Sequence, residues 1–125
     1  MLCPECDKQM LILEFREVEV DFCPSCDGVW LDQGELELLG GEENASSKVP
    51  QERKTNRRCP RCNKKMREGN YPGTKVALDT CRDGHGLWFD HGELVSVLES
   101  QGAFGAAAKL NEYFGDIFSS EKEND

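Results

Sequence analysis

A pattern of cysteine, glycine and tryptophan residues occurs twice in this chain and constrains its fold more than any other feature. Residues 23–36 read CPSCDGVWLDQGEL, and residues 81–94 read CRDGHGLWFDHGEL. When Trp30 is aligned with Trp88, the two stretches share their first cysteine, an Asp two residues after the tryptophan, and the Gly-Glu-Leu that follows. A C-P-x-C pair precedes each stretch, at residues 3–6 and 59–62. Such an internal repeat indicates one small structural unit present in two copies.

Each copy is too small to be stabilised by a hydrophobic core alone. A unit of about 40 residues is of the size at which metal ions or disulfide bonds replace much of the core. The chain has seven cysteines, opens Met-Leu-Cys without a signal peptide, and contains no long apolar run that could span a membrane. We therefore expect a cytoplasmic protein whose reduced cysteines bind metal. Disulfide bonds are the alternative, which the odd cysteine count disfavours.

The cysteines of the first copy have the spacing of a structural zinc site, in which two cysteine pairs joined by a hairpin supply four tetrahedral ligands. In the second copy, Gly84 takes the place of the fourth cysteine, and His85 follows it directly. We predict two zinc ions per chain, one bound by Cys3, Cys6, Cys23 and Cys26, and one by Cys59, Cys62, Cys81 and His85. His91 is the rival fourth ligand of the second site, although it aligns with Gln33, which is no ligand.

Hydrophobic periodicity predicts a hairpin and a short helix in each copy. The predicted strands are residues 10–15, 17–22, 66–71 and 75–80. Asp32 and Asp90 each precede a Glu by three residues, which predicts capping boxes at the starts of two helices. A last, amphipathic helix is expected after Gly102, with apolar residues at Ala103, Ala106, Ala107, Leu110, Phe114 and Ile117.

These elements predict a small metal-stabilised α+β fold of two tandem zinc ribbons with a C-terminal amphipathic helix. The first ribbon is assigned to residues 1–40 and the second to residues 59–100. Residues 41–58 contain Pro, Ser and charged residues without apolar periodicity, which is typical of a flexible linker. Residues 101–125 are expected to form the last helix and a tail that frays from Ser119.

Charge is distributed unevenly along this acidic chain, whose net charge is −9. Residues 1–40 hold ten acidic and two basic residues, whereas residues 53–67, here called the basic stretch, hold no acidic residue. Its eight basic residues are Arg53, Lys54, Arg57, Arg58, Arg61, Lys64, Lys65 and Arg67. These side chains are candidate contacts to phosphate groups or to a partner. Pairing with the acidic first copy, or solvation of the linker, are the alternatives.

Other residues suggest chemistry but have simpler structural explanations. Trp30 and Trp88 would suit stacking on nucleobases, yet a ribbon of this size needs a large side chain to cover its metal site. Glu35 and Glu93 are explained by the capping boxes. Zinc with four protein ligands lacks the open position of a catalytic site, and convergent C-P-x-C pairs favour metal over redox activity. We expect no enzyme activity.

The motif C-P-x-C, a hairpin, then C-P-x-C-x-G-x-W-L-D-x-G-E-L resembles the transcription factor IIB-type zinc-ribbon family. Residues 3–39 match this pattern, and residues 59–97 match it except at the position of Cys26. The resemblance implies a zinc-ribbon fold with metal at the matching cysteines. It implies a function only loosely, because fold does not determine function.

Two functions are compatible with this sequence. The acidic composition and an exposed apolar C-terminal helix favour a protein-interaction adaptor, and the same helix would suit self-association. The basic stretch and the family resemblance favour binding to nucleic acid or to the transcription machinery instead. We expect the protein-interaction role, with nucleic-acid binding weak, and no association with membranes.

Overall fold

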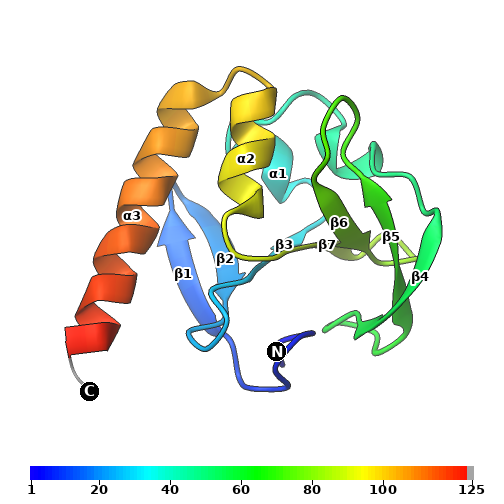
Figure 1. Cartoon of the computed structure of the whole chain (residues 1–125), viewed down its shortest axis with the longest axis horizontal. Helices are drawn as coiled ribbons and strands as arrows, with labels where there is room; N and C mark the ends of the chain where they lie inside the picture. Colours follow the sequence, from blue (N-terminus) through cyan, green and yellow to red (C-terminus); the bar gives the residue numbers. More distant parts are fainter. Residues whose placement is uncertain (124–125) are drawn as a thin grey trace.

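The computed structural model describes the backbone of residues 1–123 and the side chains of residues 1–115. Its strands form one antiparallel sheet of seven, in the spatial order β1-β2-β3-β7-β6-β5-β4. The strands are β1 (Leu11–Phe15), β2 (Val18–Phe22), β3 (Val29–Asp32), β4 (Arg53–Arg58), β5 (Lys65–Asn70), β6 (Ala77–Thr80) and β7 (Gly86–Phe89). The helices are α1 (Glu35–Leu38), the 3-10 helix η1 (Ala45–Ser47), α2 (Glu93–Ser100) and α3 (Phe104–Glu123). Figure 1 shows α2 beside α3, which runs along the β1 side of the sheet.

The predicted α+β class and the four predicted hairpin strands are confirmed, since β1, β2 and β6 lie within the expected ranges and β5 begins and ends one residue earlier than expected. Strands β3 and β7, which were not predicted from the sequence, pair with each other at the middle of the sheet. Trp30 is the register partner of Trp88 in this antiparallel pair. Because equivalent residues of the two copies meet there, the copies are related by a local two-fold axis and form halves of one sheet.

The two faces of the β3–β7 pair contribute to two different cores, since successive side chains of a strand point to opposite faces. Val29, Leu31, Leu87 and Phe89 are buried with side chains of α1, α2 and α3. On the other face, the two tryptophans are buried with Met10, Met66 and the cysteines. The central strands therefore connect a helix-covered core to the cysteine-rich core.

The segment 41–58, which was expected to be a flexible linker, contains regular structure. It forms η1, in which Ala45 and Ser46 are buried, and then the edge strand β4, which pairs with β5. The sequence RKTNRR of β4 lacks the apolar alternation on which strand prediction depends. This strand is held instead by backbone pairing and by polar contacts, among them the Arg53–Glu68 ion pair at 2.9 Å.

The capping boxes are formed only in part. Glu35 and Glu93 accept hydrogen bonds from the backbone N–H groups of Asp32 (2.6 Å) and Asp90 (2.7 Å), as a capping box requires. The N-cap residues, however, are Gly34 and its counterpart Gly92, with φ of 92° and 81°. The prediction that the Asp side chains cap these helices is therefore wrong, because both carboxylates have other partners.

The apolar side of α3 is covered by the chain itself. Ala106 is buried, and Ala107, Leu110 and Phe114 are buried in the helix-covered core, where the Phe114 ring stacks on Phe22 with centroids 5.9 Å apart. The predicted exposed apolar helix is therefore not observed as far as Phe114. The side chain of Ile117 and residues 124–125 lie outside the described residues, and the expected fraying from Ser119 is not tested. No helix in the described part of the chain combines the length and apolar character of a membrane span.

Candidate metal centres

The structure brings both predicted ligand sets together. Centre 1 consists of Cys3, Cys6, Cys23 and Cys26, and centre 2 of Cys59, Cys62, Cys81 and His85. Within each centre, every ligand atom lies within 4.8 Å of the others. In both centres, two ligands are buried and two are partly exposed. Three thiolates with an imidazole, or four thiolates, are the ligand sets of structural zinc sites.

The distances between ligand atoms fit tetrahedral zinc. Zn–S bonds of about 2.3 Å in tetrahedral geometry place two sulfur atoms about 3.8 Å apart. The Sγ atoms of Cys3 and Cys26 are 3.7 Å apart, and those of Cys62 and Cys81 are also 3.7 Å apart. In centre 2, the Sγ atom of Cys81 lies 3.2 Å from Nδ1 of His85, which indicates that this ring nitrogen faces the metal.

The two ligands that lie close together in sequence, such as Cys3 and Cys6, form with their turn a unit here called a knuckle. Three of the four knuckles share a backbone conformation that orients their donors. Asp7, Asp27 and Asn63 follow the second cysteine of their knuckles and have φ of 58°, 63° and 63°, in the left-handed region that Asp and Asn tolerate. The turn directs backbone N–H groups at sulfur: two of them donate to Cys3 Sγ, each at 3.3 Å. Such hydrogen bonds stabilise the thiolate form, which is the form that binds metal.

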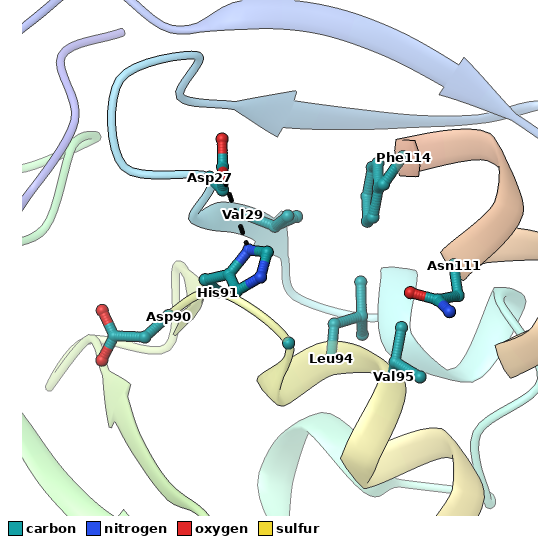
Figure 2. Close-up of a pocket in the computed structure, with 9 residues that line it drawn as sticks. Asp27, Val29, Asp90, His91, Leu94, Val95, Asn111 and Phe114 are labelled. Atoms are coloured by element: carbon teal, nitrogen blue, oxygen red, sulfur yellow. Dashed lines mark ion pairs between the residues drawn. The ribbon is translucent and has the colours of Figure 1, made fainter. Parts of the chain in front are cut away.

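His91 lies apart from centre 2. Its ring is exposed, and Nδ1 lies 3.6 Å from the Asp27 carboxylate of the first copy. Figure 2 shows this ion pair at the mouth of a small pocket between β3, the start of α2, and α3. The fourth ligand of centre 2 is therefore His85, and His91 contributes to the contact between the two copies.

Substitution of the two histidines tests this assignment. His85→Ala is expected to reduce the zinc content of purified protein from two ions per chain towards one, because three thiolates bind zinc less tightly than a complete ligand set. His91→Ala is the matched control and should retain two. Elemental analysis at a defined protein concentration measures both. The assignment fails if His91→Ala loses zinc, or if both variants retain two ions.

The tryptophans cover the metal centres as part of a core, and both are fully buried. The Trp30 indole lies against Gly86 of the second copy, and the Trp88 indole lies against Gly28 of the first. Each indole N–H donates to an Asp two residues further on, Trp30 to Asp32 at 3.0 Å and Trp88 to Asp90 at 3.2 Å. Neither ring is available to stack on a nucleobase.

Half of the basic stretch forms ion pairs within the protein. The Arg61 guanidinium pairs with both oxygens of Asp32, with Nε 2.6 Å from Oδ1. Arg57 reaches Glu5 at 2.6 Å, and Asp79 and Asp90 at 2.9 Å each. Arg53 pairs with Glu68 at 2.9 Å and also lies 3.6 Å from the Glu52 carboxylate, and Lys64 pairs with Asp83. Two arginines of the basic stretch, Arg57 and Arg61, thus bind carboxylates of the acidic first copy, as one alternative reading of the sequence predicted.

Three partly buried carboxyl groups, those of Asp32, Glu35 and Glu93, have pKa values shaped by their contacts. Arg61 holds the pKa of Asp32 below its usual range. Burial raises the pKa of Glu35 to about 6 and that of Glu93 to about 7, and the nearby carboxylates of Asp32 and Asp90 add to these shifts. Both Glu side chains accept backbone hydrogen bonds. Their perturbed pKa values are therefore accounted for by structural roles.

Comparison with known protein families agrees with this geometry. The family model described as transcription factor zinc-finger matches residues 2–40 and 58–100. These two ranges make up more than half of the chain and include every ligand of both centres. The chain belongs to the transcription factor zinc-finger family. Searches of curated proteins and of solved structures each found no match.

Zinc-finger family membership, together with the two ligand sets, identifies this protein as a zinc-binding module with two zinc ions. The separate matches correspond to the two copies that the repeat predicted. The spacing of the cysteines and of His85 predicted all eight ligands, and the basic stretch included Arg57, but the ion pair of Arg57 with Asp79 was not predicted. No local sequence pattern links these two residues, which are 22 positions apart.

Proposed function

We propose that this protein is a non-catalytic, zinc-stabilised module that binds a protein partner through the edge strand β1. The observation that carries the proposal is the chemistry of this edge. Strand β1 has the sequence LILEF, and its Leu11 and Ile12 side chains are 41% and 67% exposed. An open edge with exposed apolar side chains is a template for pairing with another strand.

The opposite edge of the sheet supports this interpretation. Strand β4 has the sequence RKTNRR, and charged side chains are a usual protection against unwanted strand pairing. When the cysteine pairs at residues 3–6 and 59–62 are aligned, β1 corresponds to β5 of the second copy. The outer edge of β5 is paired with β4. Among the described residues, no strand covers β1 in this way. A partner strand would therefore occupy, in the first copy, the place that β4 has in the second.

The surroundings of β1 specify the kind of segment that fits. Glu14, Glu17 and Glu19 are exposed along the β1–β2 hairpin, and residues 1–40 are strongly acidic. Backbone hydrogen bonds supply affinity in strand addition, and alternate side chains supply specificity. The proposed occupant is an extended segment of a partner protein in which apolar residues alternate with Lys or Arg.

The absence of catalysis and the cytoplasmic location are parts of this proposal. Both centres offer four protein ligands to zinc, which leaves no position for a substrate or an activated water. All seven cysteines are free of disulfide bonds and belong to the ligand sets. A reducing compartment such as the cytosol keeps such thiols available for metal.

Photo-crosslinking from β1 tests the proposal. A photoreactive amino acid at position 12 of the zinc-loaded protein should form a discrete crosslink to a partner in native extract, at an extended basic-apolar segment. Capture of the same partner by an affinity-tagged chain should be lost for Ile12→Lys, because a charge at the edge opposes strand addition. It should persist for the control Phe104→Lys, since Phe104 is 66% exposed but lies on α3.

Two results would refute the proposed function. The first is a partner that Ile12→Lys still captures as well as the unmodified chain, which would place binding elsewhere. The second is turnover of a substrate that depends on bound zinc, which would make the module an enzyme. Zinc content must be two per chain in every variant, so that loss of capture does not arise from unfolding.

A further inference from the structure

Seven of the eight basic residues of the basic stretch form two groups in the folded protein, and the eighth, Arg58, donates a hydrogen bond to the backbone carbonyl of Asn63. Arg53, Arg57, Arg61 and Lys64 form ion pairs with carboxylates. Lys54, Lys65 and Arg67 instead line one surface hollow, where they are joined by Arg82 from outside the stretch, with buried Met66 as the fifth lining residue. Among the residues whose side chains are described, none of these four cations forms an ion pair within 4.0 Å. We propose that this hollow binds phosphate groups, with the backbone of a nucleic acid as their macromolecular source.

Strand register places like charges side by side at the hollow. Lys54 is directly opposite Arg67 in the β4–β5 pair, and Arg58 is directly opposite Lys65. Like charges at directly opposed positions destabilise a sheet. The neighbouring pair, Arg53 and Glu68, has opposite charges and forms an ion pair. The uncompensated Lys54–Arg67 pair therefore lies at the hollow, where Lys65 adds a further positive charge and an anion would relieve the repulsion.

The zinc-ribbon fold does not require these cations. In the first copy, the positions of Lys65, Arg67 and Arg82 are occupied by Gln9, Leu11 and Pro24, none of which is charged. Centre 2, next to Arg82, also carries one less negative charge than centre 1, because a neutral imidazole replaces a thiolate. Both differences make the second copy the more favourable half for an anion.

The lining of the hollow also determines how the anion is recognised. It offers ammonium and guanidinium groups, which bind phosphate oxygens, and it has no aromatic side chain on which a base could stack. The expected binding is independent of base sequence and weak, with a dissociation constant in the range of about 10⁻⁴ to 10⁻⁶ M at physiological salt. This site is separate from β1, so its test is independent of the proposed protein partner.

The test is a titration of the zinc-loaded full chain, labelled with ¹⁵N, with a twelve-nucleotide oligothymidylate and, separately, with pyrophosphate. Amide shifts should concentrate at Lys54, Lys65, Arg67 and Arg82. For the double variant Lys54→Gln/Lys65→Gln, affinity should fall about tenfold, and the slope of log K against log salt should decrease by about 0.7 for each lost contact. The single variant Lys75→Gln removes an exposed lysine outside the hollow and is the control.

Each outcome of this titration decides the proposal. If millimolar pyrophosphate does not displace the bound oligonucleotide, the phosphate groups that the hollow recognises are those of a nucleic-acid backbone. If pyrophosphate binds as tightly as the oligonucleotide, the hollow binds free phosphate compounds instead, and the nucleic-acid source is refuted. The proposal is overturned if neither ligand binds at 0.05 M salt, a condition that favours phosphate contacts strongly. It is also overturned if the double variant binds like the Lys75→Gln control while retaining two zinc ions.

Discussion

Removal of zinc is expected to unfold the protein. Binding free energies of structural zinc in small domains are about 10 to 16 kcal/mol per ion, whereas a typical domain has a net stability of about 5 to 15 kcal/mol. Trp30 and Trp88 are buried in one cluster with Cys3, Cys23, Cys59 and Cys81, so this core loses its support when the cysteines separate. Because β3 and β7 also contribute to the helix-covered core, the loss should extend to both halves of the sheet.

Tryptophan fluorescence and circular dichroism measure this effect. On addition of a chelator, emission should shift to longer wavelength as both indoles enter water, and the far-ultraviolet signal should decrease. Excess zinc should restore both signals, and elemental analysis should then give two ions per chain. A control with chelator already saturated by zinc should show no change. The coupling of folding to metal binding would be contradicted if metal-free protein kept its native circular dichroism signal and the emission wavelength of buried tryptophans.

The features that sequence reasoning predicted are local. Cysteine spacing specifies the ligand sets, because two knuckles at the ends of one hairpin must meet. The alternation of Val18, Val20 and Phe22 with acidic residues specifies β2 because its period is two residues. Asp or Asn after the second cysteine indicates the left-handed turn that three of the knuckles adopt. In each case, the residues concerned lie within one copy, so their pattern is visible without knowledge of the whole fold.

The features that were missed depend on contacts between the copies. Strands β3 and β7 have four residues each, too few for periodicity to mark them, and they pair across 58 residues of sequence. Strand β4 is polar because it is an edge, so its composition is typical of a linker. Asp32 precedes Glu35 by three residues, as an N-cap residue would, but the N-cap is Gly34 and the Asp32 carboxylate binds Arg61 of the other copy. Spacing alone could not predict these contacts.

Substitution of Gly86 by alanine is expected to destabilise the protein by about 3 kcal/mol or more. A Cβ atom at this position would overlap the backbone carbonyl of Leu31 and lie 2.7 Å from Cζ2 of the buried Trp30 ring. The carbonyl cannot move without disturbing the β3–β7 pair, in which Gly86 is opposite Asp32. Urea unfolding at a fixed concentration of free zinc measures the change, since bound metal contributes to apparent stability.

Glycines elsewhere in the chain make this prediction specific. At Gly28 a Cβ atom would overlap the Trp88 ring but lie 3.2 Å from the Phe89 carbonyl, so the clash is mainly with a side chain, and Gly28→Ala should cost less than Gly86→Ala. At Gly105, on α3, the Cβ has open space, and alanine should be neutral or stabilise by up to about 1 kcal/mol through helix propensity. Since Gly86 is not a ligand, its variant should still bind two zinc ions. Unfolding of all three variants at the same urea concentration as the unmodified chain would contradict this prediction. It would mean that the close packing of each tryptophan against the other copy does not hold the two ribbons together.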